Sequence, residues 1–149
     1  MHKLLFTLTV FAFLSTDTMR AQSSDSLQVE RACLDYIEGF YEGDTMKLKA
    51  CLRPTLYKYG YWKNKEGAYT GEQMTYAEAI AYGKEVLEKK QFAKPTAPKK
   101  VQVLDVQAQV ACAQIFAWWG MDYALLSKKE GVWKIEQVLW QGPYKTIKL

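Results

Sequence analysis

The sequence predicts one α+β domain, in which three helices come first and a mainly antiparallel sheet comes last. Apolar residues recur at helical spacing in the first part of the chain after residue 21, and four strand-like runs separated by short breaks form the last third. Connections this short favour antiparallel neighbours, because a parallel crossover needs a dozen or more residues. Helices followed by an antiparallel sheet are typical of the α+β class. The 149 residues suffice for one such domain.

The first 21 residues predict a signal peptide. Lys3 supplies positive charge, an apolar run extends from Leu4 to Leu14, and the small residue Ala21 ends the segment. The run is shorter than the roughly 20 residues that a membrane span needs, and no later run is long and apolar enough. The alternative is a buried N-terminal helix. We expect residues 22–149 to form a single exported domain, periplasmic or secreted, with no membrane span.

The predicted first helix follows a short polar segment and ends at a glycine. Ser26 can cap this helix, because a serine hydroxyl can accept a hydrogen bond from an unpaired backbone N–H. Gly43 ends it, because glycine readily adopts the left-handed conformation found after helices. Between them, apolar residues recur at the spacing of one helical face. These residues are Val29, Cys33, Tyr36, Ile37 and Phe40.

A second helix and a first strand are predicted next. Asp44 can cap a short helix from Thr45 to about Leu52. Pro54 terminates that helix, since proline lacks the N–H that the helix needs. The tyrosine-rich run Leu56–Lys63 then predicts a strand.

A turn and a third helix follow this strand. Residues 64–67 predict a turn, and residues 68–70 a short strand that pairs back. Thr75 and Glu78 have the spacing of a capping box, which predicts a helix running to about Lys90. Its expected buried face consists of Tyr76, Ile80, Gly83 and Leu87.

The last third of the chain predicts a four-stranded antiparallel meander. A tight hairpin turn is expected at Glu130-Gly131, where glycine can adopt a positive φ. One face of this sheet must be buried, and the helices supply the cover. The expected strands are residues 101–107, 109–118, 121–128 and 132–140.

Composition argues against several classes of function. The formal net charge is only +4 and the lysines are scattered among acidic residues, so we expect no nucleic-acid partner. The single histidine, His2, lies in the predicted signal peptide. The remaining chain therefore has no Ser-His or Cys-His pair and lacks the commonest metal ligand. We expect no metal and no cofactor.

Three cysteines leave two readings open. Export would permit disulfides, and Cys33 and Cys51 are the best candidate pair if the first two helices run antiparallel. The alternative is that these two and Cys112 are buried free thiols.

Short motifs spread along residues 26–142 give the chain a family resemblance. They are Tyr36-Ile37-Glu38-Gly39-Phe40-Tyr41-Glu42-Gly43-Asp44, Leu48, Pro54, Asp105-Val106, Trp118-Trp119, Asp122-Tyr123, Gly131-Val132-Trp133-Lys134-Ile135 and Trp140. Together with the element order they resemble the nuclear transport factor 2-like superfamily, and within it the putative lumazine-binding family of small bacterial exported proteins. The resemblance implies a cone, in which a strongly curved sheet wraps a long helix around a cavity open at one end. Relatives include enzymes, ligand binders and domains that only dimerise, so the fold does not determine the function.

Aromatic side chains are abundant in the elements that would line this cavity. Tyr and Trp combine a large apolar area with one polar group, a mixture that suits a small-molecule pocket. The alternative is that these side chains fill a closed core. For a ligand-binding domain we expect an open cavity of about 300 Å³ or more. The predicted ligand-binding residues are Tyr36, Phe40, Tyr59, Tyr61, Trp62, Phe116, Trp118, Asp122, Tyr123 and Trp140.

The predicted first strand presents apolar side chains on both faces. Tyr57, Tyr59 and Tyr61 alternate onto one face, whereas Leu56 and Trp62 take the other. We therefore expect one face to line the cavity and the other to contact a partner subunit, since an exposed aromatic sheet face suits a homodimer.

The leading hypothesis is an exported, non-catalytic domain that binds a small apolar or aromatic ligand. A homodimeric interaction module without a ligand is the first alternative. The second is an enzyme with a Tyr/Asp acid–base site, because an apolar cavity raises a carboxyl pKa. Asp122 is then the best candidate and Asp105 the next, but a turn residue after Gly120 is the preferred reading of Asp122, because Asp is common in turns. Relatives often carry an acidic residue at the position of Thr55. Its absence from this chain argues against the enzyme.

Overall fold

The computed structural model describes the backbone of residues 5–143 and the side chains of residues 22–143. The expected signal peptide, residues 1–21, lies outside the residues whose side chains are described. Within the described part of the chain, no helix is both long enough and apolar enough to cross a membrane.

The first helix, α1 (Leu5–Glu42), begins well before the expected cap at Ser26. The prediction that Ser26 starts the helix is therefore wrong. No glycine or proline interrupts residues 5–25, and a helix that has already formed extends readily through residues of ordinary propensity. Gly43 ends the helix as predicted, with a φ of +70°.

The second helix, α2 (Thr45–Cys51), has the predicted N-cap. A side-chain oxygen of Asp44 accepts hydrogen bonds from the backbone N–H groups of Met46 at 2.9 Å and Lys47 at 3.1 Å. Strand β1 (Leu52–Lys63) follows at once, although we predicted a strand only after Pro54. Its pairing with the last strand is irregular between Leu52 and Tyr57. Proline is tolerated in such a stretch, because a regular ladder is already interrupted there.

Strand β2 (Tyr69–Thr75) pairs back on β1 and is longer than predicted. It leads into α3 (Tyr76–Glu88), which has the predicted capping box between Thr75 and Glu78. Its buried face differs in part from the prediction, because Leu87 is exposed and Val86 is buried in its place.

The six strands in the described part of the chain form one sheet in the order β2-β1-β6-β5-β4-β3. The predicted antiparallel meander consists of β3 (Lys100–Val106), β4 (Val110–Ala117), β5 (Gly120–Lys129) and β6 (Val132–Gln141). The parallel pairing of β1 with β6 joins this meander to the β1–β2 hairpin. The predicted class, α+β with three helices against a mainly antiparallel sheet, is confirmed.

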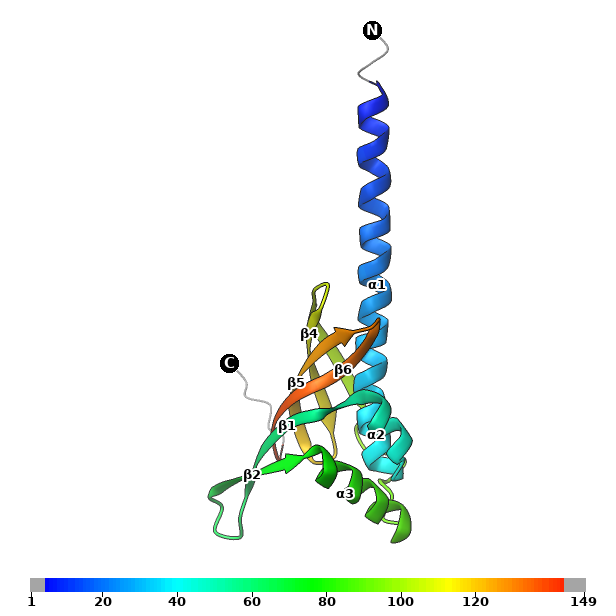
Figure 1. The fold of residues 1–149 in the computed structure, drawn as a ribbon. Helices are drawn as coiled ribbons and strands as arrows, with labels where there is room; N and C mark the ends of the chain where they lie inside the picture. The colour runs from blue at the N-terminus through cyan, green and yellow to red at the C-terminus, as the bar shows by residue number, and fades with distance from the viewer. Residues whose placement is uncertain (1–4, 144–149) are drawn as a thin grey trace.

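The sheet curls round the C-terminal part of α1 without closing, and α2 and α3 lie near one end of it (Figure 1). Every second residue of β4 faces the helix and is buried. Three of these are alanines, and their small side chains let the bulky residues Tyr36 and Ile37 of α1 pack against the sheet without any exposure. The buried β4 residues are Ala111, Ala113, Ile115 and Ala117.

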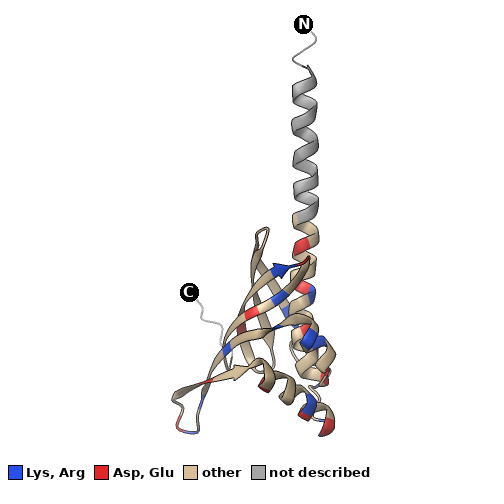
Figure 2. Ribbon diagram, in the orientation of Figure 1, with Lys and Arg blue, Asp and Glu red and all other residues tan. Residues whose placement is uncertain are grey.

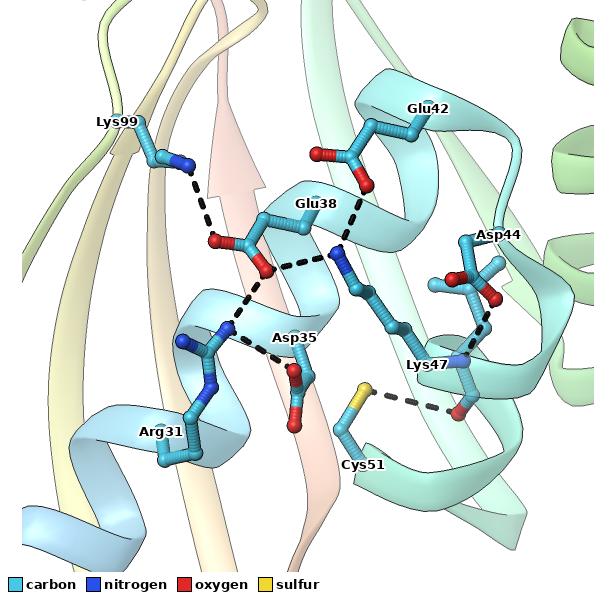
Figure 3. A network of polar contacts seen from close by, with 9 residues as sticks. Arg31, Asp35, Glu38, Glu42, Asp44, Lys47, Cys51 and Lys99 are labelled. Carbon is cyan, nitrogen blue, oxygen red and sulfur yellow. Dashed lines mark hydrogen bonds and ion pairs between the residues drawn. The ribbon is translucent and has the colours of Figure 1, made fainter.

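Charged residues of both signs are mixed over the helices and the sheet (Figure 2). The densest group joins α1 to α2 and to the loop that precedes β3 (Figure 3). Its centre is Glu38, whose carboxylate oxygens lie 2.7 Å from Arg31, 3.0 Å from Lys47 and 3.0 Å from Lys99. Burial alone would raise the pKa of Glu38, but the hydrogen bonds from Lys47 and Lys99 and the charge of Arg31 lower it to about 2. As an anion, Glu38 thus links α1 to α2 and to the loop before β3.

All three cysteines are free thiols. Cys33 and Cys51 are buried in the core, as the free-thiol reading expects, whereas Cys112 is only half-buried; the candidate disulfide is absent.

Candidate functional site

A cavity of about 200 Å³ lies between the end of α1, α3 and the concave face of the sheet. It is smaller than the roughly 300 Å³ expected for a ligand pocket. An engineered apolar cavity of about 150 Å³ binds benzene, however, so this cavity suits a small ring compound. Its lining residues are Phe40, Lys58, Met74, Tyr82, Trp118, Trp119 and Trp140.

Lys58 is the charged residue of this lining, and the alternation of β1 places it there. Tyr57 and Tyr59 point to the outer face, so Lys58 between them points inward and is only 6% exposed. Its ammonium nitrogen lies within 6 Å of the centroids of four aromatic rings. The distances are 5.2 Å to Tyr36, 5.7 Å to Phe40, 5.9 Å to Trp119 and 5.4 Å to Trp140. The electron-rich faces of Phe40, Trp119 and Trp140 can stabilise a buried cation.

Two polar side chains outside the cavity lining, those of Tyr36 and Asp122, interact with Lys58. Its ammonium donates a hydrogen bond of 2.5 Å to the hydroxyl of Tyr36. Asp122, which is wholly buried on β5, accepts a hydrogen bond of 2.9 Å from the indole N–H of Trp119 through Oδ1. Its other oxygen, Oδ2, has no partner of regular hydrogen-bond geometry among the described residues, but the hydroxyl of Tyr36 interacts with this carboxylate and helps to lower its pKa. Tyr36 and Asp122 do not line the cavity themselves.

The pKa values of this cluster reflect burial opposed by mutual attraction. Burial lowers the pKa of Lys58, and the charge of Asp122 counteracts part of that effect. Burial raises the pKa of Asp122, while the charge of Lys58 and the hydrogen bond from Trp119 oppose the rise. The pKa of Tyr36 is raised well above 10 by burial and by Asp122, so its hydroxyl keeps its proton.

One wall of the cavity depends on a glycine. Trp140 on β6 pairs with Gly60 on β1, and the indole lies so close that a Cβ atom on Gly60 would sit 1.7 Å from its Nε1 atom. Trp62 stacks on the same indole, with ring centroids 6.4 Å apart and planes inclined by 13°. Gly60 and Trp62 therefore hold Trp140 against the cavity.

Tyr41 holds the turn between β4 and β5 that carries Trp118 and Trp119. Its hydroxyl accepts a hydrogen bond of 2.8 Å from the backbone N–H of Trp118 and donates one to the carbonyl of Pro98. Its ring lies edge-on to that of Trp119, with centroids 5.6 Å apart. At the mouth of the cavity, Tyr82 and Trp118 are 40% and 57% exposed.

A second cavity, of about 480 Å³, lies between α3 and the loop of residues 91–98. Phe40, Tyr82 and Trp118 line both cavities. These three side chains separate the deep cavity around Lys58 from the wider outer one.

The predicted site residues fall into three groups. Phe40, Trp118 and Trp140 line the deep cavity. Three others do not line the cavity but contact residues that do: Tyr36 and Asp122 interact with Lys58, and Trp62 stacks on Trp140. The outer face of the sheet, away from the cavity, carries Tyr59, Tyr61, Phe116 and Tyr123.

Four lining residues are not among the predicted site residues, namely Lys58, Met74, Tyr82 and Trp119. The sequence does contain a signal that could have identified Lys58. Lys58 lies at an even position between Leu56 and Trp62, on the face for which an apolar cover was expected. A single lysine on such a face indicates either that it lies at an exposed edge of the sheet or that it is buried and has a functional role. Trp119 adjoins the predicted Trp118, but the turn rather than alternation decides which of the two packs inside.

The likeness to solved structures concerns the fold. Nuclear transport factor 2-like proteins of unknown function from Methylobacillus flagellatus KT and Shewanella baltica OS155 are 15% and 16% identical, with TM-scores of 0.61 and 0.60. Each comparison covers 79% of this chain, and 91% and 93% of those chains. A domain with a cystatin-like fold from Nostoc punctiforme PCC 73102 is 13% identical, with a TM-score of 0.53 over 84% of this chain and 79% of its own.

Among curated proteins, none matches the sequence. The sequence model of one family does, and it extends over residues 24–141, from the polar segment of α1 to the end of β6. This range includes every residue of the Lys58 cavity. The chain therefore belongs to the putative lumazine-binding family, and its fold is similar to that of nuclear transport factor 2-like proteins.

Proposed function

We propose that this domain binds a small, mainly aromatic molecule in the deep cavity and releases it chemically unchanged. The observation that carries the proposal is the lining, in which five aromatic rings and Met74 surround one buried lysine. Aromatic walls with few polar groups are typical of small-molecule sites, and methionine adapts its shape to what it contacts. The description of the family as putative lumazine-binding also supports a small-molecule ligand.

The position of Asp122 favours binding over catalysis. A general base must reach the proton that it removes. Asp122 is wholly buried behind Lys58 and Trp119 and does not line the cavity. It therefore acts best as a counter-charge for Lys58.

The test is native mass spectrometry of the protein purified from its own host, beside a denatured control. We expect a mass excess that disappears on denaturation and identifies the ligand. Incubating the protein with more of that compound should leave the compound unchanged and raise the melting temperature. Turnover that Asp122→Asn abolishes in a folded protein would instead support the enzyme hypothesis.

Export is proposed from the sequence pattern of residues 1–21. The charged start, the apolar run and the small residue Ala21 support removal of this segment. The intact mass of protein recovered from the cell envelope or the medium should lack about 21 N-terminal residues. Protein that keeps Met1 and stays inside the cell would contradict the proposal.

A homodimer through the outer face of the sheet is a second proposal. Large apolar side chains on three adjacent strands are 42% to 52% exposed there, which is uncommon for an isolated soluble domain. They are Tyr57, Tyr61, Tyr123, Leu125 and Leu139.

Light scattering after size exclusion tests the dimer. We expect twice the chain mass for the natural protein and one chain mass for the double variant Tyr123→Lys/Leu139→Lys. Leu27→Lys, at an exposed position on α1, is the matched control and should stay dimeric. A monomeric natural protein at micromolar concentration would refute the dimer without affecting the binding proposal.

A further inference from the structure

Lys58 has more hydrogen-bond donors than its surroundings use. A lysine ammonium carries three N–H donors. One donates to the hydroxyl of Tyr36, and no other residue that the structure describes accepts a hydrogen bond from this ammonium. Buried donors without an acceptor are unfavourable. The interaction with aromatic rings offsets only part of that cost.

The unused donors lie at the inner end of the cavity. The ammonium nitrogen is 5.4 to 5.9 Å from the ring centroids of Phe40, Trp119 and Trp140, and these three rings line the cavity. An acceptor atom placed among these rings would therefore be within reach of Lys58.

Lys58 and Asp122 lie close enough for the charge of each to act on the other. When both are ionised their charges cancel, and the ammonium of Lys58 still carries N–H donors. A charged ligand would bring an uncompensated charge into an apolar cavity, which is costly. The cavity therefore favours a neutral ligand that offers an acceptor.

We propose that Lys58 donates a hydrogen bond to a carbonyl oxygen of a neutral, planar aromatic ligand. The ligand's ring lies against Trp119 and Trp140, and Met74 adjusts to its outline. Tyr36 and Asp122 are positioning residues, which hold the nitrogen of Lys58 in place and balance its charge. This assignment rests on the proposed binding function and adds the chemical class of the ligand.

Three single-ring probes of similar size test the assignment. Acetophenone offers a carbonyl oxygen, ethylbenzene lacks an acceptor, and benzoate carries a negative charge. Their dissociation constants are measured from the nuclear magnetic resonance signals of the indole N–H groups of Trp119 and Trp140. We expect acetophenone to bind about ten-fold more tightly than ethylbenzene, because a hydrogen bond from a charged donor is worth at least that factor. Benzoate should bind more weakly than acetophenone.

The matched variants separate Lys58 from the cavity as a whole. Lys58→Met/Asp122→Asn removes the donor and its counter-charge together and keeps the shape of both side chains. It should abolish the preference for acetophenone and retain the binding of ethylbenzene. Lys63→Met, on the same strand but exposed, should keep the preference. The ranking of probes on the natural protein needs no variant, so the test holds even if the double variant does not fold.

Each contrary result has a distinct meaning. Equal affinities for acetophenone and ethylbenzene would overturn the role of Lys58 and leave the binding function standing. Tighter binding of benzoate would overturn the neutral ligand, since it would show a cationic site. Failure of all three probes to shift the two indole signals would overturn the proposed function and this inference together.

Discussion

The indole of Trp140 occupies the space that a side chain on Gly60 would fill, with its Nε1 atom 1.7 Å from the position of that missing Cβ. The two residues are paired across β1 and β6, which form the one parallel strand pair within residues 5–143. This close approach places a tryptophan ring beside Lys58, 5.4 Å from its nitrogen. The parallel strand pair thus contributes directly to the binding site.

Gly60→Ala should therefore displace Trp140 and impair the cavity. We expect a loss of about 1–3 kcal/mol in the free energy of unfolding, the usual cost of overpacking, together with loss of probe binding. Urea denaturation and a binding titration measure the two effects. Gly67→Ala is the control, because no atom lies within 4 Å of its added Cβ. Its positive φ of +82° makes this change destabilising as well, but binding should persist.

Lys58 and Asp122 should be strongly coupled in stability. Lys58→Met alone leaves a buried carboxylate without its counter-charge, which should cost about 3–5 kcal/mol. Adding Asp122→Asn should recover a large part of that loss, because the pair is removed as a unit. Urea unfolding of the four proteins of the cycle gives the coupling energy. Additive losses would show that the two groups do not interact, and Lys63→Met should change stability by less than about 0.5 kcal/mol.

Acid should destabilise the fold through Glu38. The pKa of Glu38 is about 2 in the folded protein, below its ordinary value of 4.5. A lowered folded pKa contributes stability that is complete above the ordinary value and is lost as the pH falls from about 4.5 towards 2. Glu38→Gln should therefore reduce stability at pH 7 and flatten the pH dependence in this window. Unfolding curves at several pH values test this, with the exposed Glu88→Gln as a control that keeps the natural slope.

Tyr41→Phe should loosen the mouth of the cavity without emptying the core. The ring contact with Trp119 remains, whereas the hydrogen bonds to the backbone of Trp118 and Pro98 are lost. We expect a loss of about 1–3 kcal/mol, since two partly buried hydrogen bonds are lost and each is worth about 0.5–1.5 kcal/mol. Hydrogen exchange at the Trp118 amide should accelerate more than exchange in β5. Unchanged protection of that amide would contradict the role given to Tyr41.

The three thiols should differ in reactivity. Burial raises the pKa of Cys33 to about 12 and also raises the pKa of Cys51, so both stay protonated and shielded. Cys112 is only partly buried. A thiol reagent should modify Cys112 first, and the other two only after unfolding. Mass spectrometry of the native protein would show one adduct, and Cys112→Ser would show none.

Local signals determined much of the fold. Asp44, the Thr75–Glu78 capping box and Gly43 each act through atoms within a few residues, so their effects can be recognised in the sequence. The meander was predictable for the same reason, because its connections are too short for other arrangements. The start of α1 was not, since Ser26 is compatible with both a cap and a helix interior.

The candidate site was only partly predictable. Phe40, Trp118 and Trp140 could be chosen as large aromatics on the right elements. Tyr59, Tyr61 and Tyr123 have the same chemistry but lie on the outer face. Alternation showed that the tyrosines of β1 share one face, yet it could not show which face turns towards α1.

By itself, the sequence determined the helices, their caps, the antiparallel meander and the abundance of aromatic side chains, because these depend on spacing and short-range hydrogen bonds. The tertiary structure alone decided that β1 pairs in parallel with β6, that Lys58 faces inward, and that Tyr36 and Asp122 stand behind it. The physical reason is that these contacts join residues 22 to 86 positions apart in the chain, and only the curl of the sheet around α1 brings them together.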